Sequence, residues 1–230
     1  MHASPEVLVL RETFQIARGA ADEETVVVAS FEHDGIVAHG EGAPVDYWGE
    51  TPEAIREALE ADGGALLGDD LFASERVLAR VSAWDGPQGA KMALDGVLHD
   101  WLGKRVGQPV WRLLGTDRVT PPTSYTIGID SVEGTAEPVV EHAVERHLRA
   151  LRAVPGSHAA RALGLQVMLG CMIESELGIA QAAQLASLVD YIDLDGHLLI
   201  SSRPFSGLGL LDGRLVLSDK PGLGVERTDG

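Results

Sequence analysis

Side chains that could bind charge or transfer protons gather around two short apolar segments in the C-terminal part of the chain. The first segment is residues 165–169, and the second begins at Tyr191. The residues that could do chemistry there are Cys171, Met172, Glu174, Asp193, Asp195 and His197. Two carboxylates separated by one residue at a strand end suit a bound ammonium group as well as a metal ion. The sequence therefore predicts a small-molecule site at these positions.

A strand–helix–strand unit is expected to position these residues. Residues 165–169 form an apolar run typical of a strand buried on both faces. Ser175 can cap the following helix, and Glu176 suits the positive first turn of that helix. Residues 191–194 provide the second strand. In such βαβ units, polar residues at the carboxyl ends of the parallel strands line the ligand site.

The same residues carry a resemblance to a known family. The motif GCMIES at 170–175, followed by DYIDLDG at 190–196, resembles strands seven and eight of the dipeptide epimerases, a branch of the enolase superfamily. Members of this family combine an α+β capping domain with a (β/α)7β barrel. The resemblance therefore implies an α/β chain with a capping domain and a TIM-like barrel.

The resemblance also implies substrate-binding positions. Asp193 and Asp195 match the motif that holds the amino terminus of a dipeptide, and Arg18 matches an arginine that pairs with a substrate carboxylate. Thr126 corresponds to a position that faces the substrate. From the residues alone, Arg18 is equally a solvated loop residue, and Thr126 equally a β-former within a strand. The full implied set is Arg18, Thr126, Met172, Ile173, Glu174, Asp193 and Asp195.

The first part of the chain indicates an α+β unit. Strands are predicted at residues 7–14, 25–32 and 36–41, with a type I′ turn at Asp34-Gly35 between the last two. Helices are predicted at residues 52–60, 73–82, 88–102 and 109–114, with Gly103 ending the third. The segments GEGAPVDYWGET (40–51) and ALDGVLHDWLGKRVGQPVWRLLG (93–115) resemble the loop and closing helices of the capping domain.

Most of a barrel is missing from the rest of the chain. Residues 125–130 resemble strand one, and a helix is predicted at 135–153, yet only residues 131–164 separate strand one from strand seven. A complete barrel takes about 250 residues. We therefore expect about three parallel strands in the order seven, eight, one, with a left-handed crossover from strand one to strand seven, against the usual rule. The exposed edges of such a sheet suggest a homo-oligomer.

The domain boundaries follow from this interpretation. Residues 1–119 form the expected capping domain, and residues 120–200 form the barrel remnant, with Pro121-Pro122 at the boundary. The tail, residues 201–230, is expected to return and complete the capping domain.

The catalytic groups of the family have no counterpart here. Epimerisation needs Mg²⁺ to stabilise an enolate and two bases to move the α-proton. In the family, the lysine bases come from strands two and six and the metal ligands from strands three, four and five. The only lysines of this chain are Lys91, Lys104 and Lys220, which lie in the capping helices and the tail. We therefore assign no catalytic residue and no metal ligand, and we interpret Cys171 as a small buried residue rather than a nucleophile.

Composition excludes several partners. The net charge of −17 argues against nucleic acid and against an anionic membrane surface. One cysteine fits a reducing compartment, and neither a signal peptide nor a membrane-spanning run is visible, so a cytoplasmic protein is expected.

Three functions remain open. The resemblance implies a lineage of Mg²⁺-dependent dipeptide epimerases, acting on substrates such as L-Ala-D/L-Glu, whose activity this chain lacks. A non-catalytic dipeptide-binding or assembly protein is the first alternative. An acid-sugar dehydratase of the same superfamily is the second, although the CMIES and DLDG motifs argue against it.

Overall fold

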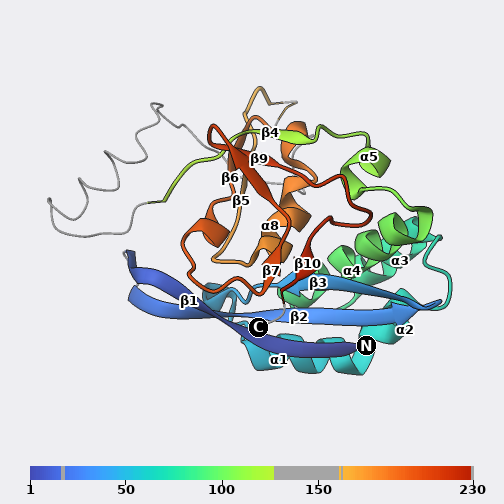
Figure 1. Cartoon of the computed structure of the whole chain (residues 1–230). Coiled ribbons are helices and arrows are strands. Elements are labelled where there is room, and N and C mark those ends of the chain that lie inside the picture. Colours follow the sequence, from blue (N-terminus) through green and yellow to red (C-terminus); the bar gives the residue numbers. More distant parts are fainter. Residues whose placement is uncertain (17–18, 127–160, 162, 229–230) are drawn as a thin grey trace, which may run out of the picture.

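The computed structural model describes residues 1–16, 19–126, 161 and 163–228. The predicted helix at 135–153 and the crossover between strands one and seven lie outside these residues. Figure 1 shows a long sheet crossing the lower half of the view and a group of short strands around helix α8 above it. The described chain therefore contains two layers, built mainly from its first and last parts.

Three long strands form the main sheet, in the order β1-β2-β3 and antiparallel throughout. They are β1 (His2–Ile16), β2 (Gly19–His33) and β3 (Ile36–Gly42), so all three predicted strands are confirmed. Strands β1 and β2 are longer than predicted because they pair along most of their length. The turn between β2 and β3 has φ of +50° at Asp34 and +73° at Gly35, as a type I′ turn requires.

Helices and helical turns follow the sheet. They are the 3₁₀ turn η1 (Asp46–Trp48), α1 (Pro52–Ala58), the π-helical turn η2 (Leu59–Gly63), α2 (Gly64–Leu67), α3 (Ser74–Ala83), α4 (Gln88–Val106) and α5 (Val110–Leu114). Thr51 caps α1, accepting a hydrogen bond from Ala54 N at 3.1 Å. The four predicted helices are thus present, and the first continues through η2 into α2.

Gly103 does not end α4, and that prediction is wrong. The helix continues to Val106 and ends at Gly107, whose φ is +67°. Gly103 is needed inside the helix because a Cβ there would lie 2.6 Å from the Cα of Gly222 in the tail. The residue is therefore a close-packing position between the helix and the tail.

Strand β2 is buried on both faces, which fixes where the layers meet. Val27 and Ala29 belong to the core that the sheet forms with α1, α3 and α4. Val28 belongs instead to a cluster with Leu177 of α8 and Phe205 of the tail. Successive side chains of a strand point to opposite faces, so β2 separates a helical core from the layer that carries the polar strand ends.

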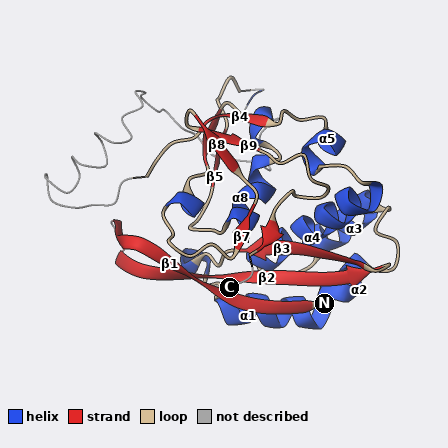
Figure 2. Cartoon of the chain, viewed as in Figure 1, coloured by secondary structure: helices blue, strands red, loops and turns tan. Residues whose placement is uncertain are grey.

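The remaining elements are short, and Figure 2 shows them grouped above the main sheet. They are β4 (Val119–Pro122), β5 (Met168–Gly170), α8 (Glu176–Ala183), η3 (Ala186–Leu188), β6 (Tyr191–Asp193), η4 (Gly196–Leu198), β7 (Phe205–Ser206), β8 (Gly209–Leu211), β9 (Arg214–Val216) and β10 (Glu226–Arg227). Strand β4 contains the two prolines at the expected boundary and pairs with β9 of the tail. The tail therefore contacts the segment after the boundary as well as α4.

Within the described ranges, no helix combines the length and the hydropathy needed to cross a lipid bilayer. Among the described strands, none pairs with the edge of β5 that faces away from β6.

Candidate functional site

The two strands that carry the candidate residues lie side by side. Strands β5 and β6 are parallel, and Gly170 at the end of β5 lies opposite Asp193 at the end of β6. Helix α8 connects them, and Ser175 caps it by accepting a hydrogen bond from Leu177 N at 3.1 Å. The predicted βαβ unit is confirmed, although its first strand begins at Met168 rather than at residue 165.

A third segment joins β6 on its other side. Thr123 forms a parallel bridge with Ile192, and Ser124 N donates to Ile192 O at 3.2 Å. Strand β5, strand β6 and the segment at Thr123 are therefore neighbours in the order expected for barrel strands seven, eight and one. The bridge precedes the predicted strand at 125–130, of which only the first two residues are described, and these two are not in a strand.

Asp195 lies where these segments converge. Its side chain is buried and Oδ2 accepts a hydrogen bond from the backbone N–H of Thr126. Burial raises the pKa of Asp195, the Thr126 hydrogen bond opposes that shift, and the Asp193 carboxylate adds to it. Asp193 Oδ1 is buried and has no hydrogen-bond partner among the described residues. The structure thus brings Thr126, Asp193 and Asp195 together and leaves one acceptor unused.

The 172–174 segment packs directly on the loop after β6. A side chain at Gly196 would overlap the carbonyl oxygen of Met172, so only glycine permits this contact. Met172 is 41% exposed, whereas Ile173 packs against a cluster that includes Leu8 and Ile200. Met172 is therefore available to a ligand, and Ile173 also supports the contact with the main sheet.

Glu174 points inward, toward Glu41 at the end of β3. Glu174 Oε1 accepts a hydrogen bond from Met172 N at 3.1 Å, and its other oxygen is buried without a partner among the described residues. Gln181 of α8 holds the same strand end by bonding both Glu41 N and Glu41 O, at 2.6 and 3.1 Å. Sequence reasoning did not identify Glu41, although its place between two glycines in GEG, at a strand end, was a usable signal.

The two nucleophile or base candidates are poorly suited to proton transfer. Burial raises the pKa of the Cys171 thiol well above its ordinary value, and the nearby Glu174 carboxyl adds to this effect. Burial lowers the pKa of His197 to about 4. At neutral pH the first is a protonated thiol and the second a neutral imidazole.

The described residues at the strand ends do not fit a magnesium ion. Within the described part of the chain, no three His, Cys, Asp or Glu side chains are placed to hold a metal together. Asp195 already uses one oxygen for Thr126 N, as described above. Mg²⁺ prefers six oxygen ligands in near-octahedral geometry, so no step of a reaction is assigned to it.

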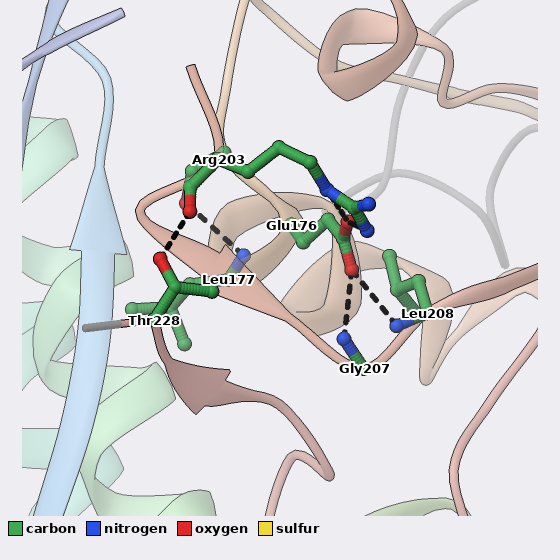
Figure 3. Close-up of polar contacts among 7 residues, drawn as sticks. Glu176, Leu177, Arg203, Gly207, Leu208 and Thr228 are labelled. Carbon is green, nitrogen blue, oxygen red and sulfur yellow. Dashed lines mark hydrogen bonds and ion pairs between the residues drawn. The ribbon is translucent and has the colours of Figure 1, made fainter. Parts of the chain in front are cut away.

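Glu176 ties α8 to the tail. Figure 3 shows its carboxylate between the guanidinium of Arg203 and the backbone N–H groups of Gly207 and Leu208. Arg203 Nη2 donates at 2.5 Å, and the two backbone donors lie at 2.8 and 3.0 Å. Thr228 in turn donates to Arg203 O. Glu176 therefore has a structural role and is not part of the proposed ligand site.

A cavity of about 1150 Å³ opens beside the strand ends. It lies between the loop after β3, α4, β5 and α8, and its walls include Met172 and Glu174. Its acidic lining residues are Glu50, Asp95 and Glu174, and no lysine or arginine lines it among the residues that the structure describes. Ligand pockets are commonly about 300–1,000 Å³, so the cavity has room for a dipeptide-sized cation.

Comparisons with known proteins identify the relatives of this chain. The family model for the mandelate racemase / muconate lactonizing enzyme N-terminal domain matches residues 4–115. An L-Ala-D/L-Glu epimerase of Bacteroides thetaiotaomicron is 24% identical over 330 residues, covering 96% of this chain and 86% of that protein. That aligned span is 100 residues longer than the whole of this 230-residue chain. The relative therefore has a large block without a counterpart here.

Other relatives match less of their own length. A hydrophobic dipeptide epimerase of Enterococcus faecalis is 32% identical over 146 residues, covering 61% of this chain and 41% of that protein. An L-Lys-D/L-Arg epimerase of Methylococcus capsulatus is 33% identical over 137 residues, covering 58% of this chain and 38% of that protein. In these two pairs the matched part is well under half of the relative.

Solved structures show the same fold. The L-Ala-D/L-Glu epimerase of Bacillus subtilis, in a substrate-liganded complex, gives a TM-score of 0.86 at 18% identity, covering 100% of this chain and 98% of that one. The Methylococcus capsulatus dipeptide epimerase, in complex with Mg and L-Arg-D-Lys, gives 0.82 at 22% identity, covering 97% and 98%. With the capping-domain match and the sequence relatives, these findings show that the chain belongs to the enolase superfamily, in its dipeptide epimerase branch, as a shortened member.

Proposed function

We propose that this chain binds dipeptides at the carboxyl ends of β5 and β6 but does not epimerise them. The observation that carries the proposal is the buried Oδ1 of Asp193, which has no partner among the described residues and lies beside the buried carboxyl of Asp195. A buried acceptor without a donor is costly, and an ammonium group supplies such donors. The matched relatives are named dipeptide epimerases, which supports a dipeptide over an acid sugar.

Each residue has a defined part in this proposal. Asp193 and Asp195 receive the ammonium group, with Asp195 held in place by Thr126 N. Met172 contacts a substrate side chain from the exposed side of the loop. Arg18 would pair with the substrate carboxylate, and this role stays a prediction because Arg18 lies outside the described residues.

Two further residues of the implied substrate-binding set remain predictions. Ile173 supports the loop that carries Met172, since it packs against the main sheet. Glu174 lines the neighbouring cavity while its Oε2 lies near Glu41, so a contact between Glu174 and the substrate stays a prediction.

No lysine of this chain is placed to act as the base of an epimerase at the proposed ligand site. Lys91 Nζ donates to Ser82 O at 3.3 Å, Lys104 to Asp100 at 2.6 Å and Lys220 to Glu226 at 2.6 Å. All three lysines are therefore used on the capping helices or the tail, away from the strand ends. Removing a proton α to a carboxylate requires a positioned base and stabilisation of the enolate, and the residues that the structure describes offer neither at the ligand site. A cytoplasmic location completes the proposal and is supported by the single cysteine.

Binding of L-Ala-L-Glu by isothermal titration calorimetry tests the proposal. Asp193→Asn keeps the shape of the side chain and removes its charge, so we expect roughly tenfold or greater weakening of binding. Asp212→Asn is the matched control, because Asp212 lies in the tail turn between β8 and β9 with φ of +50°, which asparagine tolerates.

A blocked ligand separates ammonium recognition from other contacts. N-acetyl-L-Ala-L-Glu lacks the positive charge, so we expect no measurable binding to the wild-type chain. Equal affinity for the free and acetylated dipeptides, or an unchanged affinity in Asp193→Asn, would show that the two aspartates do not form an ammonium site.

A further inference from the structure

Two buried carboxyl groups from distant parts of the chain meet beside α8. Glu41 is fully buried and Glu174 is 3% exposed. A Cβ added at Gly178 would lie 2.6 Å from Glu174 Oε2 and 2.7 Å from Glu41 Oε1. The two oxygens are therefore no more than about 5 Å apart, close enough for their charges to interact strongly. Glycine at 178 leaves the space into which both groups point.

The hydrogen bonds of the pair are unequal. Glu41 Oε1 accepts from Ser175 N at 2.9 Å, and Glu41 Oε2 accepts from Ser175 Oγ. Glu174 accepts only from Met172 N, and its Oε2, the oxygen nearer Gly178, has no partner among the described residues. The hydrogen-bond donors of Ser175 therefore stabilise Glu41 as a carboxylate, whereas Glu174 has one such donor.

No basic side chain neutralises the pair within the described part of the chain, where neither residue forms an ion pair. Among the described residues, Glu6 of β1, which pairs with Arg227 at 2.7 Å, also raises the pKa of Glu41, and the Cys171 thiol lies close enough to Glu174 to be affected by it. Burial raises the pKa of Glu41 to about 7 and, together with the charge of Glu41, that of Glu174 to about 8. Neither neighbour supplies a positive charge to reverse these shifts.

We propose that Glu41 and Glu174 share a proton, carried on Glu174 Oε2, and that this proton holds the end of β3 against the loop before α8. Protonated Oε2 becomes a donor that faces Glu41, which removes both the unpartnered acceptor and the repulsion between two like charges. The pair thereby acts as a proton-dependent latch between the capping layer and the βαβ unit. Losing the proton leaves two buried negative charges side by side and loosens that contact.

The direction of the pH effect follows from linkage. A carboxyl whose pKa is raised in the folded state stabilises the fold fully when the pH is below its unfolded-state pKa, near 4.5. This contribution is lost as the pH rises through the folded-state pKa values, which are about 7 for Glu41 and about 8 for Glu174. Stability should therefore fall between about pH 5 and pH 8, opposite to the effect of an ordinary ion-paired carboxylate.

Urea unfolding of the full chain from pH 5 to pH 9 tests the latch. Glu174→Gln imitates the protonated acid and cannot titrate. Relative to this variant, we expect the wild-type unfolding equilibrium constant to rise by up to about tenfold per pH unit between pH 5 and pH 8. Glu12→Gln, the same change at an exposed position of β1, should follow the wild type. Parallel pH profiles for the wild type and Glu174→Gln would overturn the proposal.

Infrared spectroscopy in D₂O gives a readout that does not depend on a variant folding. The folded wild type should show a protonated-carboxyl band at pH 7 that is clearly stronger than the band of Glu174→Gln, in which only Glu41 of the pair can hold a proton. In Glu41→Gln the band should disappear at a lower pH, because the repelling charge is gone. A folded wild type with no such band at pH 7 contradicts the shared proton.

Discussion

Replacing Asp100 by alanine is expected to lower the free energy of unfolding by about 3–5 kcal/mol, because it removes a buried carboxylate that joins three segments. Asp100 Oδ1 accepts from Leu223 N at 2.9 Å, and Oδ2 accepts from His39 N at 2.9 Å and from Lys104 Nζ at 2.6 Å. The substitution leaves two backbone donors and one ammonium group without their acceptor. The measurement is urea unfolding at pH 7.

The control for Asp100 lies on the same helix. Asp95 also has a partner four residues away, His99 at 2.8 Å, but its side chain is 53% exposed. Exposed pairs contribute little, so Asp95→Ala should cost less than about 1 kcal/mol. Similar losses for the two variants would mean that Asp100 does not hold the tail and β3 on α4.

A methyl group at Gly42 is expected to cost at least about 3 kcal/mol, since backbone atoms leave no room for it. A Cβ there would overlap the carbonyl oxygen of Gly89 in α4, and Gly40 makes the same close approach to Ala93. These two glycines let β3 lie directly on the helix. Overlap with backbone cannot be relieved by a side-chain rotation, so the strand or the helix must shift.

Gly64→Ala is the matched substitution for Gly42→Ala. Gly64 is helical, with φ of −63°, and a Cβ added there would meet no atom within 4 Å beyond its own helix and chain neighbours. Alanine there should be neutral or stabilising by up to about 1 kcal/mol. Thermal unfolding of both variants would separate steric overlap from a general effect of alanine, and equal melting temperatures would contradict the close packing of β3 on α4.

Local signals in the sequence were sufficient for several elements. The Asp34-Gly35 turn, the cap at Ser175 and the parallel strands of the βαβ unit depend on residues close together in the chain, and the structure confirms all three. Gly103 was wrongly predicted to end α4, because a glycine that follows a helical pattern commonly marks the end of a helix. Its contact with Gly222 is a tertiary feature that no local pattern reveals.

The candidate site was predictable only in part. Family motifs indicated Asp193, Asp195 and Thr126, and the structure brings these residues together. The partnership of Glu41 with Glu174 and Ser175 joins segments more than 130 residues apart, as the separation of 134 between Glu41 and Ser175 shows. Burial and the lack of a neighbouring base decide its chemistry, and neither is encoded in spacing.

The central claim is that the chain keeps dipeptide recognition without proton transfer. The most direct measurement is exchange of the α-protons of L-Ala-L-Glu in D₂O, followed by NMR with Mg²⁺ and then with EDTA, on protein shown by calorimetry to bind the dipeptide. We expect binding with no deuterium incorporation at either α-carbon under both conditions. Deuterium incorporation that requires Mg²⁺ and disappears with EDTA would contradict the account, because it would require a base and a metal site that the residues described above do not form.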